Sequence, residues 1–225
     1  MIQPSTLDFL RSLAQYNSKE WFNAHKDDYL RARANVADFA RELLHRMKEH
    51  DHIQTERSGD NLYRIYNDLR FHKDKPPFNA RFAGGFHRVK PQLRGGYYFQ
   101  IEPGNSYVSC GFFGPNAEDL KRIRQDIDLN HEAWREVLSE PKLWATYGHM
   151  VGEQLKTAPS GYAKDHPAVD LLRYKQFIFR HRFTDAQVMQ QDAVERFDRA
   201  FQAIRPFFDY MSEVLTTNAN GESLI

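Results

Sequence analysis

The strongest constraint on the fold is a helical repeat of apolar residues in the C-terminal part of the chain. Thr184 and Gln187 stand in capping-box register, which predicts a helix start. Pro206 predicts a kink or break near Arg205, because proline removes a backbone donor. Apolar residues recur at alternating spacings of three and four: Val194, Phe197, Phe201, Ile204, Phe208, Met211 and Leu215. A coiled-coil seam shares this spacing, but a phenylalanine-rich stripe in a single-domain chain is more typical of a core.

Helical patterns also open the chain. Ser5 and Asp8 are spaced as a capping box, so we expect a first helix to start there. A second, much longer helix is expected from Asn17, with Glu20 at the reciprocal capping position, to about Glu49.

The sequence predicts strands in the centre of the chain. Two segments rich in aromatic and β-branched residues, 97–102 and 107–113, flank Pro103-Gly104, which predicts a hairpin with a type II turn. Residues 176–183 predict a further strand, and Asn116 predicts the cap of a helix. The sequence therefore predicts an α+β fold, with helices at both ends packed on a small, mainly antiparallel sheet with a central β-hairpin.

Composition places the chain among ordinary globular proteins. It has 225 residues, 41% hydrophobic and 27% charged, which excludes collagen-like, disordered and membrane classes. We find no linker, repeat or low-complexity tract, so we expect one domain over residues 1–225. No apolar run approaches the ~18 residues that cross a bilayer, and the N-terminus lacks signal-peptide features, so we expect a cytoplasmic protein with no membrane partner. The single cysteine, Cys110, fits a reducing compartment and should be a small buried hydrophobe.

Positive charge is concentrated in one segment. Residues 64–94 hold eight lysines and arginines against two aspartates, a local net charge of +6, although the whole chain carries only +1. Such a concentration is a candidate footprint for an anion. Arginine suits phosphate and carboxylate groups because its planar fork donates two parallel hydrogen bonds, and lysine adds a point charge.

Within this segment lies the run YRIYNDLRFHKDKPPF, residues 63–78. An extended chain would place Arg64, Asp68 and Arg70 on one face, whereas a helix would stack Leu62, Ile65, Tyr66 and Leu69. The periodicity does not choose between them, but Arg64 and Asp68 can share one side in either case.

The run resembles the signature of a widespread, uncharacterised bacterial protein family of about this length, a domain of unknown function. That signature is Arg-x-x-Arg-Asp-x-Arg-Phe followed by Asp-Lys-x-Pro-Tyr-Lys. The blocks FLRSLAQYNSKEWFNAHKDDY, GYYFQIEPGNSYVSCGFFGP and PSGYAKDHPAVDLLRYK resemble the same family. The resemblance spans nearly the whole chain and implies a single domain, but it carries no activity, ligand or catalytic residue. The chain departs from the signature at Asn67, where arginine is usual, and at Phe78 and Asn79, where tyrosine and lysine are usual.

Three interpretations of the segment remain open. It can bind an acidic or phosphate-bearing small molecule, with or without a reaction, in which case the candidate ligand-binding residues are Arg64, Asp68, Arg70, Lys73, Asp74 and Lys75. It can belong to a protein or nucleic-acid interaction module, since aromatic residues interleave the cations. The Arg64, Asp68 and Arg70 side chains can also form a purely structural network.

Spacing motifs for a metal site, a serine nucleophile or a phosphate loop are missing, so we predict no cofactor and no metal and assign no catalytic residue.

Overall fold

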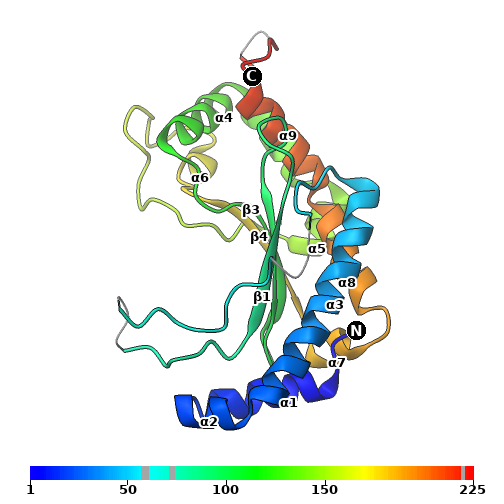
Figure 1. Ribbon diagram of the computed structural model, residues 1–225. Coiled ribbons are helices and arrows are strands. Elements are labelled where there is room, and N and C mark those ends of the chain that lie inside the picture. The colour runs from blue at the N-terminus through cyan, green and yellow to red at the C-terminus, as the bar shows by residue number, and fades with distance from the viewer. Residues whose placement is uncertain (57–60, 71–73, 219–220) are drawn as a thin grey trace. The chain divides into compact units, whose positions relative to one another are not determined.

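The computed structural model describes residues 1–56, 61–70, 74–218 and 221–225 (Figure 1). Its helices and strands, in chain order, are α1 (Pro4–Gln15), α2 (Lys19–Ala24), α3 (Lys26–His50), β1 (Phe82–His87), β2 (Gly96–Ile101), β3 (Ser106–Phe112), α4 (Ala117–Leu138), α5 (Pro141–Tyr147), α6 (Val169–Leu172), β4 (Phe177–Phe183), α7 (Asp185–Met189), α8 (Ala193–Ala203) and α9 (Arg205–Thr216). None of the described helices is long and apolar enough to cross a membrane.

The residues group into two compact units. Unit 1 comprises Met1–Phe86, Tyr98–Val108 and Arg182–Arg199. Unit 2 comprises His87–Tyr97, Ser109–His181 and Ala200–Ile225.

The architecture confirms the predicted α+β class. Helices lie at both ends of the chain, and the strands form one antiparallel sheet in the order β1-β2-β3-β4 (Figure 1). The predicted hairpin is β2 and β3. Its turn has the type II features, because Gly104 has φ 70° and the Asn105 amide donates to the Glu102 carbonyl at 3.0 Å.

Strand β1 was not predicted, because its paired glycines, Gly84 and Gly85, usually weaken a strand. The structure shows why Gly84 suits this place. A Cβ atom there would lie 2.8 Å from the Asn61 carbonyl oxygen and 2.8 Å from the Phe99 ring. The strand therefore depends on a close approach that only glycine permits.

Two predictions at the N-terminus were wrong in detail. Helix α1 starts at Pro4 after Gln3, and no side chain caps it, so Ser5 is inside the helix and is not its cap. Proline suits this position because the first helical amides have no partner within the helix. The expected long helix is two helices separated at His25, and Ser18 caps the first by accepting a hydrogen bond from the Trp21 amide at 3.1 Å.

The C-terminal predictions are confirmed at the capping box and at Pro206, but the expected helix is also interrupted between Met189 and Ala193. Thr184 and Gln187 form a capping box at the start of α7, and the helical stripe breaks between α8 and α9, just before Pro206. Asn116 caps α4 as predicted, and this helix runs to Leu138 with a kink at Asn130.

Each unit has its own aromatic core. In unit 1, Phe197 packs edge-on against Phe39 and stacks on Phe183, with centroid distances of 5.1 and 4.1 Å. In unit 2, Phe208 lies 5.1 Å from Tyr97, edge to face. All seven residues of the predicted C-terminal stripe are buried, which confirms a core.

The prediction for Cys110 is also confirmed. Its side chain is fully buried in unit 2, 3.3 Å from the Tyr147 hydroxyl. Burial raises the pKa of the thiol.

Candidate functional site

The basic run forms an arm that precedes β1 in unit 1. We call residues 61–70 and 74–81 the arm. Its two segments run antiparallel through a bridge between Tyr66 and Phe78, and Figure 1 shows them side by side. A second antiparallel bridge joins Leu62 of the arm to Gly84 of β1. The run is therefore neither a regular strand nor a helix, which explains why its periodicity fits both templates.

The arm is fixed to helix α2 and the turn before it. The Asn17 side chain accepts from the Phe78 amide at 3.1 Å and donates to the Phe78 carbonyl at 2.9 Å, as a neighbouring strand would. The Phe22 ring stacks on Phe78 with centroids 4.1 Å apart and meets the Tyr66 ring edge-on at 5.7 Å.

The positions that depart from the family-like signature hold the arm together. The Asn67 side chain donates to the Pro76 carbonyl at 2.8 Å. The Asn79 backbone amide donates to the Ile65 carbonyl at 2.7 Å and its side-chain amide donates to the same oxygen at 3.3 Å, and Phe78 makes the contacts just described. The Asn67 and Asn79 side chains thus bond within the arm, the Phe78 ring packs on α2, and none of these contacts involves a charged side chain.

Three of the predicted site residues come together near the end of the arm. Asp68 accepts two side-chain hydrogen bonds from Arg70, from Nε at 3.0 Å and from Nη2 at 2.8 Å, and one from the Arg70 amide at 3.1 Å. Arg64 Nη2 lies 3.7 Å from the same Asp68 carboxylate. Two guanidinium groups thus converge on one carboxylate, and the hydrogen bond to Asp68 raises the pKa of Arg70.

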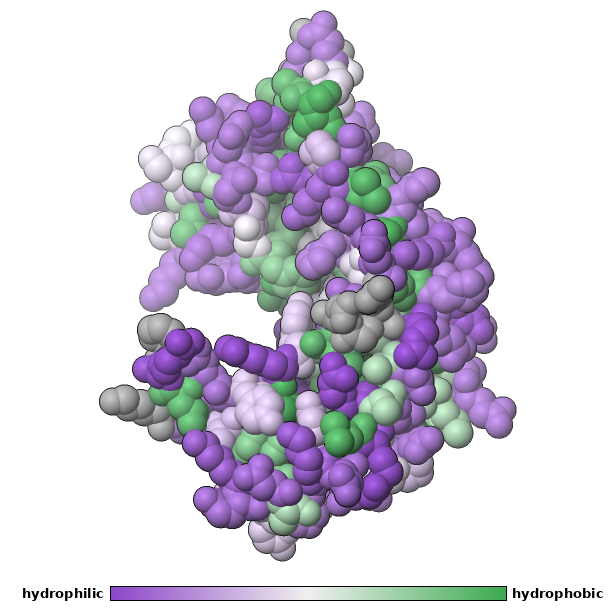
Figure 2. Space-filling model, in the orientation of Figure 1, coloured by the Kyte–Doolittle hydropathy of each residue, from purple (hydrophilic) through white to green (hydrophobic). Residues whose placement is uncertain are grey.

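The arginines of this group are open to solvent. Their side chains are 71% exposed for Arg64 and 79% for Arg70, whereas Asp68 is only 25% exposed. The carboxylate is therefore mostly buried, whereas the two arginines beside it face solvent. Figure 2 shows hydrophilic residues over the outer part of the arm.

The other predicted residues are not joined to this group. Asp74 and Lys75 are both exposed, and within the described residues neither forms an ion pair with Arg64, Asp68 or Arg70. Lys73 lies outside the described residues.

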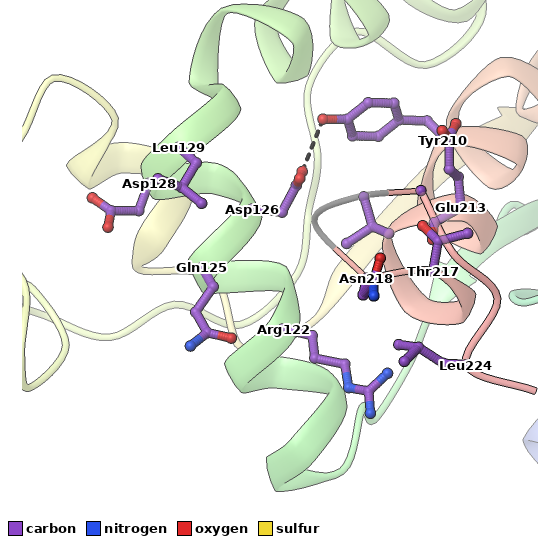
Figure 3. A pocket seen from close by; sticks show the side chains of 12 residues that line it. Arg122, Gln125, Asp126, Asp128, Leu129, Tyr210, Glu213, Thr217, Asn218 and Leu224 are labelled. Carbon is purple, nitrogen blue, oxygen red and sulfur yellow. Dashed lines mark hydrogen bonds between the residues drawn. The ribbon is translucent and has the colours of Figure 1, made fainter.

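Three cavities in the described part of the chain have other linings, and sequence reasoning did not identify them. One of about 700 Å³ in unit 2 lies between α4 and α9, where Tyr210 donates to Asp126 at 2.9 Å (Figure 3). A second, of about 410 Å³, lies in unit 1 beside Trp21 and His25, and a third, of about 380 Å³, lies in unit 2 beside Trp144. The cap at Asn116 predicts the start of α4, but the sequence carries no local signal for the helix that packs against α4.

The Asp126 carboxylate beside the cavity between α4 and α9 is well satisfied. It also accepts from the Trp134 indole at 2.7 Å and from the Asn130 amide group at 2.8 Å. The bond from Tyr210 connects α4 to α9, whereas the bonds from Trp134 and Asn130 lie within α4, and together they explain the place of Asp126 structurally. Among the described residues, no three His, Cys, Asp or Glu side chains gather in a way that could hold a metal ion.

Comparison with known proteins identifies the family. No curated protein and no solved structure matches the chain. A family model described as conserved hypothetical protein (DUF2461) matches residues 5–210, which include the whole arm and parts of both units. The chain therefore belongs to the DUF2461 family of conserved hypothetical proteins.

Proposed function

We propose that this protein binds an acidic or phosphate-bearing ligand on the arm, with Arg64 and Arg70 as the principal contacts and Lys75 as an additional positive charge. The observation that carries the proposal is the orientation of Arg70. Asp68 holds its guanidinium group through two hydrogen bonds, yet the side chain remains 79% exposed.

An oriented arginine is a better anion receptor than a mobile one. Binding must pay for ordering a long side chain, and a guanidinium that is already held loses less freedom when a ligand arrives. Its planar fork can then donate two parallel charge-assisted hydrogen bonds to a phosphate or carboxylate.

Exposure argues against a purely structural role for this group. Ion pairs between solvent-exposed side chains add little to stability, because water screens both charges and two long side chains must be held in place. Asn17 and Phe22 already fix the arm to α2. Because the arginines are open to solvent, they suit a ligand group that the protein contacts on one side only, such as the phosphate of a larger molecule.

Calorimetric titration with inorganic tripolyphosphate at low salt tests the proposal. We expect Arg70→Ala to weaken binding about tenfold, the effect of losing a hydrogen bond to a charged group. Arg41→Ala is the matched control, because Arg41 is also a largely exposed arginine paired with a nearby aspartate, Asp38, at 2.8 Å. Equal affinity of wild type and Arg70→Ala, or no binding to wild type, would refute the proposal.

A further inference from the structure

A row of three tyrosines lies beside the arm in unit 1. The Tyr63 ring of the arm lies 6.1 Å from the Tyr98 ring of β2, at an interplanar angle of 28°. Tyr98 in turn lies 5.7 Å from the Tyr107 ring of β3, at 34°. The three rings are thus consecutive neighbours, each inclined to the next, although they come from three separate parts of the sequence.

The row occupies the sheet face opposite the core of unit 1. Side chains alternate along a strand, so Tyr98 points away from the face that carries the buried Phe99. Ala83 of β1 alternates in the same way with Phe82, and the Tyr63 amide donates to the Ala83 carbonyl at 2.8 Å, so Tyr63 lies beside β1. Tyr63 is 56% exposed, and Tyr98 and Tyr107 are half-buried.

Hydrogen bonds hold the central ring. The Tyr98 hydroxyl donates to the Gln100 side chain at 3.0 Å. Gln100 is itself buried, and its amide group donates to the Asn105 carbonyl at 3.1 Å and to Glu102 at 2.5 Å. Burial and the neighbouring Tyr107 raise the pKa of Tyr98, so the phenol stays neutral at physiological pH.

Cations flank the row. Arg64 follows Tyr63 in the chain, and Arg81 directly precedes β1, the strand paired with the one that carries Tyr98. At the other end, Arg182 of β4 donates to the Asn105 side chain at 2.7 Å. Aromatic rings beside a positively charged path are the chemistry that binds single-stranded nucleic acid, because bases stack on the rings while lysine and arginine follow the phosphates.

We propose that Tyr63, Tyr98 and Tyr107 form a stacking platform for the bases of a single-stranded nucleic acid whose phosphates are bound by Arg64 and Arg70. This inference rests on the proposed function, and it specifies the ligand as a polymer of phosphates and planar rings. A single strand fits better than a duplex, since the base faces of a duplex are stacked on one another and unavailable to tyrosine.

Fluorescence anisotropy with labelled oligothymidylate and oligouridylate of about twelve nucleotides, at about 50 mM salt, tests the inference. We expect Tyr63→Ala to weaken binding about 5- to 150-fold through loss of one stacked base, and Tyr63→Phe, which keeps the ring, to stay within about twofold of wild type. Tyr16→Ala is the matched control, because Tyr16 is 52% exposed in the same unit but lies at the end of α1. Tighter binding of one of these two polymers than of the other supports the inference, and the polymer that binds more tightly identifies the nucleic acid as DNA or RNA.

A labelled abasic strand of equal length separates this inference from the function on which it rests. The inference predicts that the abasic strand binds more weakly and is insensitive to Tyr63→Ala. Equal binding of abasic and base-bearing strands, both weakened by Arg70→Ala but not by Tyr63→Ala, would overturn the stacking platform and leave the anion site in place. Failure of both strands and of tripolyphosphate to bind would overturn both proposals.

Discussion

The buried arginine of unit 2 provides a quantitative test of how this structure is stabilised. Arg88 has a fully buried side chain, and its Nη2 donates to Asp209 at 2.7 Å. Its Nη1 donates to the Arg94 carbonyl at 3.2 Å and lies 3.4 Å from the Ser212 hydroxyl. Asp209 is 55% exposed, so the two partners of this ion pair differ greatly in their access to water.

This asymmetry predicts unequal effects of removing each partner. Asp209→Ala leaves a guanidinium group buried without its anion, which costs about 3 kcal/mol, at the lower end of the usual range because solvent can reach the vacated site. Arg88→Met removes the buried charge and fills most of its space. The remaining carboxylate is rehydrated, so we expect a loss of about 1 kcal/mol, mainly from the carbonyl that loses its donor.

Urea denaturation followed by circular dichroism measures both changes, with the denaturant slope checked for constancy. The double variant Arg88→Met with Asp209→Ala should be more stable than Asp209→Ala alone, because it no longer buries an unpaired charge. The reasoning is refuted if Arg88→Met costs as much as Asp209→Ala, or if the double variant is the least stable of the three.

Three further predictions concern the arm, the cysteine and the hairpin. Asp68→Asn should leave the thermal midpoint within about 2 °C of wild type, because exposed ion pairs contribute little, and a larger fall would show that the arm network is structural. Burial raises the pKa of the Cys110 thiol. Its reaction with Ellman's reagent in the native protein should therefore not accelerate between about pH 7 and 9, where an ordinary thiol ionises. A tenfold rise in the reaction rate per pH unit would contradict this expectation. Gly111→Ala should lower the free energy of unfolding by about 3 kcal/mol or more, since its Cβ would lie 2.1 Å from a backbone carbonyl oxygen of β4. Gly104→Ala, with open space around it, should lower it by only about 1–2 kcal/mol, because of the positive φ at this position. Similar thermal midpoints for the two variants would contradict the packing argument.

Local signals predicted the parts of the fold that local chemistry controls. Pro103-Gly104, Asn116 and Pro206 each act within a few residues, through a fixed φ, a side-chain cap or a missing donor, and each produced the expected turn, helix start or break. The same reasoning failed at His25, where the helical pattern continues but the helix does not.

The candidate site was predicted only in part. The spacing of Arg64 and Asp68 correctly placed them on one side of the chain, since that holds for either backbone conformation. Whether the group is buried or exposed depends on what packs against the arm, and no residue within the run carries that information. The sequence alone therefore left a structural network, a ligand site and an interaction module open for the same side chains.

The amino-acid sequence by itself determined the α+β class, the central hairpin, the C-terminal core stripe and the concentration of positive charge, because periodicity, turn residues and composition are properties of short stretches of chain. Only the tertiary structure decided that β1 is a strand and that Tyr63, Tyr98 and Tyr107 lie in one row. Both features depend on contacts between residues distant in sequence, such as the close approach of Gly84 to the Phe99 ring and to the Asn61 carbonyl.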